Sequence, residues 1–186
     1  EFQITRDGER RVTVTRWMHD IDAPPFWAKN MRDKFPDFEG KVDRWQIIHF
    51  EAPSTICIDV GVAKAGSGAQ QGDRSHGVNG YVMNTITPKD ARTSHYFWAF
   101  MRNYRLDSQL ITTQLREGVR GVFAEDEEML IAQQRAIDAN PGHSFYSLNI
   151  DGGGMWVRRI LDELLAAEGR GSDATARPPL RPVANG

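Results

Sequence analysis

The hydrophobic period of this sequence changes at Tyr104, and this change constrains the fold more than any other feature. Before Tyr104, apolar and β-branched side chains recur mainly at every second residue, which is typical of strands. After Tyr104 the period is 3.6 residues, which indicates helices. Strands in succession followed by helices favour an antiparallel sheet covered by C-terminal helices, an α+β fold. The strands are expected at Val42–Phe50, Thr55–Ala63, Gly77–Thr87 and Ser94–Tyr104.

The segment before these strands is expected to hold a hairpin and a short helix. Glu1–Met18 alternates on both sides of a turn at Asp7-Gly8. Two prolines break the pattern in His19–Pro25, and Phe26–Phe35 has the length of a short helix. At the other end of the sheet region, Ser94–Tyr104 is apolar on both faces, so we expect it to lie centrally in the sheet.

The C-terminal part is expected to form two helices and a tail. Leu106–Asn140 should be mainly helical, with an interruption near Gly118 and Gly121. Gly169–Gly186 is rich in Gly, Pro and Ala without a period, which predicts a flexible tail. Between them, Met155–Glu168 is amphipathic, with the inward positions Val157, Ile160, Leu161, Leu164 and Leu165.

Composition and charge exclude several classes of partner. The chain has 186 residues, enough to bury a core as one domain or a large part of one. Its net charge of −2 gives no electrostatic reason to expect nucleic acid or an anionic membrane. The sequence has no apolar run of the roughly 20 residues that span a bilayer. Cys57 is its single cysteine, so the default is a reduced, cytoplasmic protein.

Asp126 is the residue of the long helix that most needs an explanation. A carboxylate facing a core needs a cation, a cluster of donors or a metal ion. The alternative is that an acidic residue early in a helix complements the helix dipole or pairs with an arginine. Asp126 is therefore a candidate metal ligand or catalytic residue. At helical spacing it shares a face with the apolar residues Val122, Phe123, Met129, Leu130 and Ile137.

A second polar residue, Asn84, stands among apolar residues in the Gly77–Thr87 strand. It is either a core amide satisfied by its neighbours or a donor aimed at a ligand in a cavity. Other chemistry has little support, because the sequence has no zinc-binding HExxH or CxxC pattern, no phosphate-binding loop and no GxSxG nucleophile motif. Cys57 is expected to be a packed thiol, and no two histidines are close enough to form a helical metal pair.

Several blocks, taken together in order, resemble one known family. They are APPFW (23–27), VDRWQI (42–47), DVGVAKAG (59–66), ITP (86–88), YFW with RN (96–98, 102–103), FAED (123–126) and LNIDGGG (148–154). These blocks are similar to the oxygenase component of vanillate O-demethylase, a Rieske-type non-haem iron oxygenase. The resemblance runs from about Arg16 to Glu168.

The resemblance implies a helix-grip (START-like) catalytic domain, a curved antiparallel sheet wrapped around a long helix with a cavity between them. In this family two His and one Asp hold a mononuclear Fe(II) ion. The Asp of the FAED block corresponds to Asp126. Asn84 and Asp59 are the expected substrate contacts, although the alternation of the strand also allows Asp59 to face solvent.

The sequence departs from the family pattern in its cysteines and histidines. A 2Fe–2S Rieske cluster needs two Cys and two His, which one Cys cannot supply. The two iron-binding His normally precede the segment that matches Glu1. We therefore expect residues 1–168 to be the C-terminal part of the catalytic domain, with the N-terminal Rieske domain absent from this chain. Alone, such a chain is expected to be inactive.

For the intact protein, the resemblance implies oxidative O-demethylation of a methoxylated aromatic acid, with release of formaldehyde. Dioxygen is the oxidant, and electrons come from NAD(P)H through a separate reductase and the Rieske cluster. The family also implies a homotrimer. Vanillate, another methoxybenzoate and a methyl-bearing aromatic sulfonate all remain open as substrates. The alternative function is a non-enzymatic helix-grip module that binds a small aromatic or apolar molecule.

Overall fold

A computed structural model of the chain describes residues 1–144 and 146–169. They divide into two compact units, Glu1–Leu106 together with residues 150–169, and Asp107–Asn149. Each unit is described by itself. The expected tail at Gly169–Gly186 lies outside the described residues apart from Gly169.

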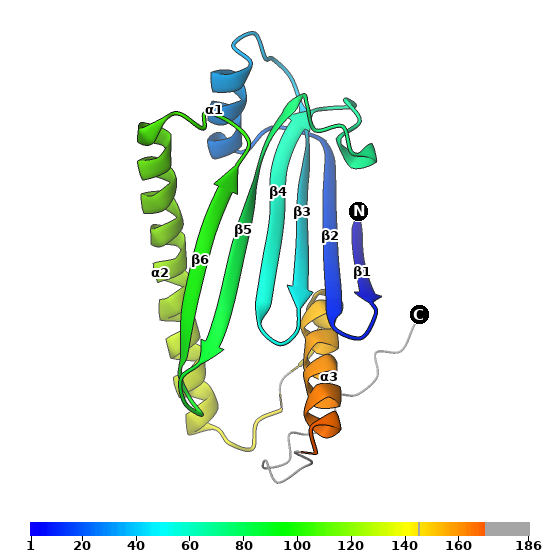
Figure 1. Cartoon of the computed structure of the whole chain (residues 1–186), viewed down its shortest axis with the longest axis vertical. Coiled ribbons are helices and arrows are strands. Elements are labelled where there is room, and N and C mark those ends of the chain that lie inside the picture. The colour runs from blue at the N-terminus through cyan, green and yellow to red at the C-terminus, as the bar shows by residue number, and fades with distance from the viewer. Residues whose placement is uncertain (145, 170–186) are drawn as a thin grey trace. The chain divides into compact units, whose positions relative to one another are not determined.

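The first unit is built on one six-stranded antiparallel sheet whose strands follow each other in chain order (Figure 1). From β2 to β6, each strand pairs with the strand before it in the chain, and a short connection or a longer loop joins the two. This arrangement confirms the α+β prediction. The strands are β1 (Phe2–Asp7), β2 (Arg11–Ile21), β3 (Val42–Glu51), β4 (Thr55–Lys64), β5 (Gly77–Pro88) and β6 (Ser94–Arg102).

The prediction of a central position for the last strand is wrong, because β6 lies at the edge of the sheet. In a sheet that runs in chain order the last strand has one neighbour, whatever its side chains. Its apolar residues remain accessible, and Phe97 is 59% exposed. The expected break after Met18 is also displaced, since β2 continues through a bulge to Ile21, with Asp20 at a φ of 52°.

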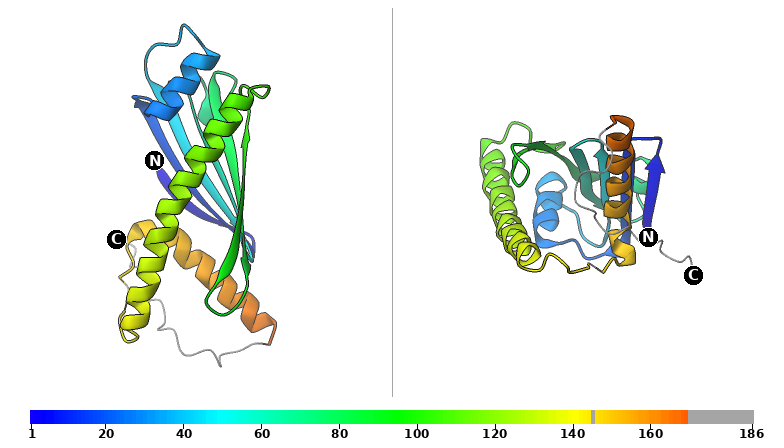
Figure 2. Two further views of the ribbon diagram at one scale, coloured as in Figure 1. Left: turned by 90° about the vertical axis from the view of Figure 1, so that its left-hand side faces the viewer. Right: turned by 90° about the horizontal axis from the view of Figure 1, so that it is seen from below.

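Two helices of the first unit, α1 (Pro25–Lys34) and α3 (Gly152–Ala167), lie on the same side of the sheet (Figure 2). The fully buried Ile160 of α3 packs against Val12 of β2 and Ala52. Its neighbours Val157, Leu161 and Leu164 pack against the same cluster, as the periodicity predicts. Leu165 differs from the prediction, because this side chain is exposed.

The helix α3 begins earlier than the periodicity predicts, and it includes the glycines from Gly152 onward. Two of them lie directly against the sheet. A Cβ at Gly152 would lie 2.8 Å from Cδ1 of Ile4, and one at Gly153 would lie 2.6 Å from Cγ2 of Val14. Glycine is therefore required there for the close approach of helix and sheet.

Part of the opposite face of the sheet is covered by the loop between β4 and β5, while Tyr81 and Met83 of that face are exposed. Trp17 and Trp45 stand on this face and form a buried cluster with Ala63. Ala69, in the short 3-10 helix η1 (Ala69–Gln71) of the loop, completes the cluster. This loop is polar and rich in Gly, and its Ala69 closes the core on this face.

The second unit is dominated by the helix α2 (Gln109–Ala139), which Ser108 caps by accepting a hydrogen bond from the Ile111 N–H. It is continuous, so the interruption predicted near Gly118 and Gly121 is absent. Residues Asn149–Asp151 form the 3-10 turn η2. Among the described residues, no helix has both the length and the apolar character needed to cross a membrane.

Candidate functional site

Asn84 is a buried polar group on the helix-bearing face of the sheet. The register pairs it with Ile56 of β4 on one side and Trp98 of β6 on the other. Its side chain is 2% exposed. The hydroxyl of Tyr96 donates a 2.8 Å hydrogen bond to Asn84 Oδ1. Because the carbonyl oxygen has this partner, the orientation of the amide is fixed.

The amide nitrogen of Asn84 has no hydrogen-bond partner within residues 1–144 and 146–169. It therefore presents two N–H donors from an apolar face that includes Val82 and Ile56. This nitrogen keeps some accessible surface, because the fully buried side-chain atoms without a hydrogen bond among the described residues are Arg44 Nε, Ser67 Oγ and Tyr104 OH. Two N–H donors on an apolar face suit a ligand that brings an acceptor oxygen. The contribution of Tyr96 could not be read from the sequence, because it depends on the pairing of two strands.

Asp59 stands on the opposite face of the sheet from Asn84. The two residues differ in parity along paired strands, since Ile56 is opposite Asn84 while Asp59 is opposite Tyr81. One ligand therefore does not contact both the carboxamide of Asn84 and the carboxylate of Asp59.

Both carboxylate oxygens of Asp59 already have protein partners. Oδ1 accepts a 2.8 Å hydrogen bond from Trp45 Nε1, and Oδ2 lies 2.5 Å from Nη1 of Arg74. The guanidinium of Arg74 also lies over the Trp45 ring, 4.6 Å from its centroid. This geometry gives Asp59 the role of holding the β4–β5 loop. A substrate contact by Asp59 remains a prediction, and its partners argue against it.

Asp126 lies midway along α2 in the second unit, with its side chain exposed. The second unit taken by itself has no layer that covers the apolar stripe of this helix. In the described part of the chain, no group of three or more His, Cys, Asp or Glu side chains is placed to hold a metal ion. An Fe(II) site of two His and one Asp therefore does not fit the described residues alone, and Asp126 is at most one of its ligands.

Two of the histidines and Cys57 have contacts with other side chains or a packed environment. His49 Nδ1 lies 3.0 Å from Oγ1 of Thr13, and His19 Nδ1 lies 3.4 Å from Oδ1 of Asp43. Burial raises the pKa of the Cys57 thiol, and the charge of Asp59 adds to this effect. A thiol with a raised pKa is a poor nucleophile at neutral pH, which agrees with the prediction of a packed cysteine.

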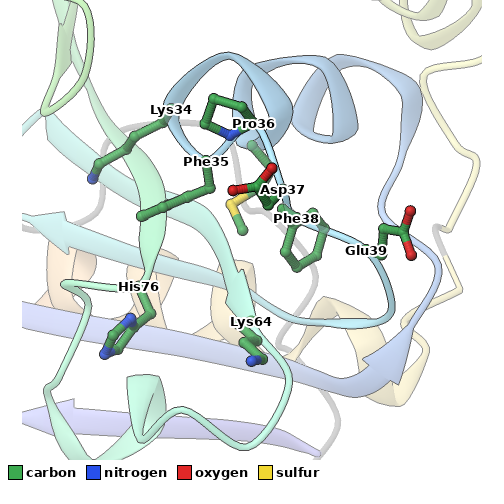
Figure 3. A pocket seen from close by; sticks show the side chains of 9 residues that line it. Lys34, Phe35, Pro36, Asp37, Phe38, Glu39, Lys64 and His76 are labelled. Atoms are coloured by element: carbon green, nitrogen blue, oxygen red, sulfur yellow. The ribbon is translucent and has the colours of Figure 1, made fainter.

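A separate open hollow of about 400 Å³ lies beside the end of α1 (Figure 3). Its wall carries both charges, with Lys34, Lys64 and His76 on one part and Asp37 and Glu39 on another. The Lys34 ammonium is already engaged, since it donates a 2.7 Å hydrogen bond to the Gly77 carbonyl, and burial lowers its pKa. None of the site residues predicted from the sequence lines this hollow.

The sequence is similar to proteins of known activity over nearly its whole length. It is 40% identical over 170 residues to the vanillate O-demethylase oxygenase subunit of Pseudomonas sp. strain HR199, covering 91% of this chain and 48% of that protein. It is 34% identical over 172 residues to the toluene-4-sulfonate monooxygenase system iron-sulfur subunit of Comamonas testosteroni, again covering 91% and 48%. The chain thus spans about half the length of the curated relatives it matches.

The fold is also similar to that of a solved enzyme. A crystal structure of apo dicamba monooxygenase superposes with a TM-score of 0.74 at 20% identity, covering 91% of this chain and 51% of that one. Another structure of dicamba monooxygenase, with non-haem iron and dicamba, gives a TM-score of 0.70. At this identity the likeness shows the fold alone.

A family model supplies the assignment for the chain. Residues 4–167 match the model described as the vanillate O-demethylase oxygenase C-terminal domain. The matched range includes the sheet, α2 with Asp126, and α3. This chain therefore belongs to the vanillate O-demethylase oxygenase C-terminal domain family.

Proposed function

We propose that this chain is the substrate-binding part of the catalytic domain of a Rieske oxygenase. In the complete protein it would take part in the oxidative O-demethylation of a methoxylated aromatic acid such as vanillate. The observation that carries the proposal is Asn84, a buried amide with its oxygen held by Tyr96 and its nitrogen without a partner among the described residues. An aromatic acid brings an apolar ring for the sheet face and acceptor oxygens for the amide N–H groups.

Two residues have distinct roles in this proposal. Asp126 would supply the carboxylate ligand of a mononuclear Fe(II) ion, which activates dioxygen for oxidation of the methoxy group. Asn84 would bind and orient the acid through a hydrogen bond. The remaining iron ligands and the 2Fe–2S Rieske cluster would come from parts of the protein other than the described residues.

The proposal extends to the partners and location of the complete protein. Electrons would come from NAD(P)H through a separate reductase component. The toluene-4-sulfonate relative, which is named as one subunit of a monooxygenase system, supports this division of labour. We also propose a homotrimer and a cytoplasmic location.

The test is an Asp126→Ala variant of the complete oxygenase. We expect the variant to fold and to keep the visible absorption of its Rieske cluster, but to lose mononuclear iron and formaldehyde release. Glu128→Ala, on the same helix, is the matched control and should keep both. Normal iron content and turnover in Asp126→Ala would refute the ligand assignment.

A second candidate function is a non-enzymatic module that binds a small aromatic molecule. It is favoured by the lack of a three-ligand metal group among the described residues. Binding of vanillate to the chain, measured by calorimetry with and without Fe(II), separates the two functions. A binding module would take up the acid equally well without iron and in Asp126→Ala. In the complete oxygenase, formaldehyde release from vanillate would depend on Fe(II) and would be lost in Asp126→Ala, whereas a binding module would release none in any form.

A further inference from the structure

Two arginines stand side by side on the helix-bearing face of the sheet, at a distance from Asn84. Arg16 of β2 is opposite Gln46 of β3, and Arg44 follows on the same face two residues away. Diagonal neighbours on one face of an antiparallel pair have Cα atoms about 7–8 Å apart. The two guanidinium groups are therefore within reach of one small anion.

Neither arginine has an anionic partner among residues 1–144 and 146–169. The Nε atom of Arg44 is buried and donates no hydrogen bond. Burial lowers the pKa of Arg44, and the neighbouring charge of Arg16 lowers it further. Two like charges, one of them partly buried, are unfavourable unless a counter-charge is bound.

The acidic groups nearby in the chain have other partners. Asp43 accepts hydrogen bonds from the N–H groups of Asp20 and Gly66. On α1, the carboxylate of Asp33 lies 3.9 Å from Arg105. The residues paired with Arg44 on the neighbouring strands are Met18 and Val62, which offer no acceptor.

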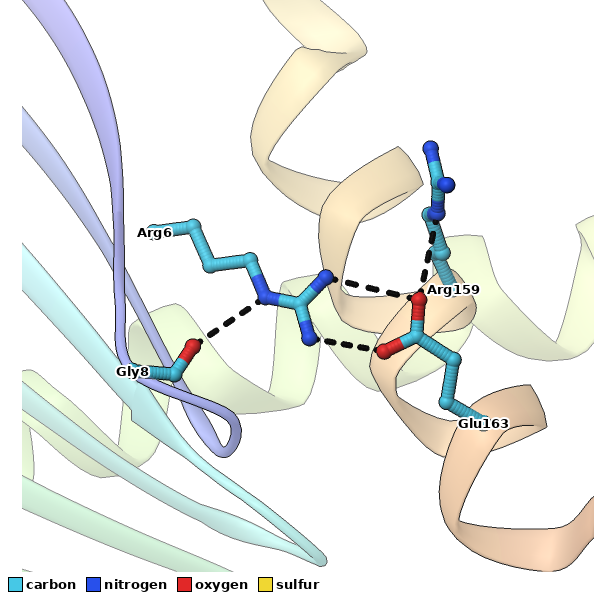
Figure 4. A network of polar contacts seen from close by, with 4 residues as sticks. All are labelled: Arg6, Gly8, Arg159 and Glu163. Atoms are coloured by element: carbon cyan, nitrogen blue, oxygen red, sulfur yellow. Dashed lines mark hydrogen bonds and ion pairs between the residues drawn. The ribbon is translucent and has the colours of Figure 1, made fainter.

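The helix α3 lies on the same face of the sheet as the two arginines. Gly153 contacts Val14, which precedes Arg16 by two residues and so shares its face. At its other end, α3 is tied to the hairpin by Arg6, which lies 2.7 Å from Glu163 (Figure 4). Arg6 is opposite Val12, so the two contacts place α3 over β1 and β2.

The N-terminus of this helix is not offered to an anion, because the acidic Asp151 stands at its N-cap position and the 3-10 turn η2 runs directly into it. The glycines Gly152 and Gly153 allow the backbone to approach the sheet face closely.

We propose that Arg16 and Arg44 form a site for an oxyanion, namely the carboxylate or sulfonate group of a small organic acid. A guanidinium fork matches the two oxygens of such a group. The site is separate from Asn84, because on β4 Val62, opposite Arg44, lies six residues beyond Ile56, opposite Asn84. Six residues of strand span about 20 Å.

The test measures thermal stabilisation of the chain by sodium benzoate and sodium benzenesulfonate. Benzyl alcohol is the neutral probe, and sodium chloride at matched ionic strength is the screening control. We expect a saturable rise of the melting temperature with both acids and none with the alcohol. Inorganic sulfate tests whether the aromatic ring is needed. If the site recognises the oxyanion alone, sulfate competes with benzoate; if it also needs the ring, sulfate does not compete.

Substitutions at the two arginines show whether the rise of the melting temperature comes from binding at this site. Arg44→Met and Arg16→Met should each raise the Kd by about tenfold or more, since each removes a charge-assisted hydrogen bond. Arg44→Lys keeps the charge without the fork and should bind with intermediate affinity. Arg10→Met, in the exposed turn between β1 and β2, is the matched control and should bind normally. If Arg44→Met does not fold, Arg16→Met, at an exposed position, still decides the question.

Two results would overturn the proposal. One is an equal shift with sodium chloride alone, which would mean a general salt effect. The other is wild-type affinity in both arginine variants together with loss of binding in Asn84→Ala, which would assign the signal to the proposed substrate contact. Loss in the arginine variants with normal binding in Asn84→Ala supports the oxyanion site, whether or not the proposed function is correct.

Discussion

The indole Nε1 of Trp45 donates a 2.8 Å hydrogen bond to Oδ1 of Asp59, and this pair joins β3 to β4 on the outer face of the sheet. The second oxygen of the same carboxylate pairs with Arg74, which arrives from the β4–β5 loop. Trp45 is fully buried, so its N–H has no access to water as an alternative acceptor. The carboxylate thereby fixes both the indole and the loop.

Removal of this carboxylate should destabilise the first unit strongly. Asp59→Ala leaves the Trp45 N–H and the Arg74 guanidinium without their partner, and we expect a loss of about 3 kcal/mol in the free energy of unfolding. Urea unfolding followed by tryptophan fluorescence measures it. Asp59→Asn, which keeps one acceptor oxygen for Trp45, should lose less. If Asp59 contacts substrate instead, Asp59→Asn would weaken ligand binding while unfolding at the wild-type urea concentration.

The sequence predicted that Asp59 lies on the opposite face from Ile56 and Ile58, because alternation along a strand is a local property. It did not predict the partners of Asp59. Trp45 belongs to another strand and Arg74 to a loop, so their approach depends on sheet register and on how the loop folds back. The edge position of β6 was not predicted for a similar reason, because apolar side chains do not determine the order of strands in a sheet.

Gly61 should be intolerant of a side chain. A Cβ there would lie 2.6 Å from Cβ of Asn79 and 2.8 Å from Cη2 of Trp45, well inside van der Waals contact. Because Trp45 is held by its bond to Asp59, we expect Gly61→Ala to lower the free energy of unfolding by about 2–3 kcal/mol.

The matched control is Gly118→Ala on α2. No atom lies within 4 Å of a Cβ at this position, and alanine is the better helix former. We expect a gain of about 1 kcal/mol in local helix stability, seen as helicity by circular dichroism. If Gly61→Ala unfolds at the same denaturant concentration as the wild type, the packing of Trp45 over this glycine is not rigid.

Tyr104→Phe should stabilise the chain. The Tyr104 hydroxyl is buried and has no hydrogen-bond partner in the described part of the chain. Removing a buried, unpaired polar group should raise the free energy of unfolding by about 1 kcal/mol. Thermal unfolding of the wild type and the variant measures the difference, and a lower melting temperature in the variant would mean that the hydroxyl has a partner.

The raised pKa of Tyr104 predicts that the stability of the chain falls at high pH. Burial raises the pKa of Tyr104 to about 12, above the usual value of about 10 for an unfolded tyrosine. The neutral phenol is therefore favoured by folding, and its contribution is fully present below pH 10. It is lost as the pH rises from about 10 toward 12. The wild type should lose more stability than Tyr104→Phe over this interval, so parallel curves would contradict the raised pKa.

The candidate site was predictable only in part, and for different reasons at each residue. Asn84 stood out because a carboxamide among Val78, Val82 and Ile86 conflicts with the pattern of an apolar strand face. Asp126 stood out by its place on a helical stripe, and its assignment as an iron ligand still rests on the FAED block. Tyr96 and the pair Arg16 and Arg44 carry no local signal, because each becomes notable only when strands are paired in register.

The most direct test of the proposed substrate contact uses Asn84 and Tyr96 in the complete oxygenase. Asn84→Ala removes the amide donors and should raise KM for the aromatic acid by about tenfold, with a smaller change in kcat. Asn84→Asp keeps the shape but replaces donors by a negative charge, so it should raise KM for an anionic substrate further. Tyr96→Phe frees the amide to rotate and should raise KM by a factor of about three to ten.

Tyr81→Phe is the matched control. It removes a hydroxyl from the opposite face of β5 and should leave KM unchanged. If all three changes at Asn84 and Tyr96 leave KM at the wild-type value, the buried amide is a structural group and the acid binds elsewhere.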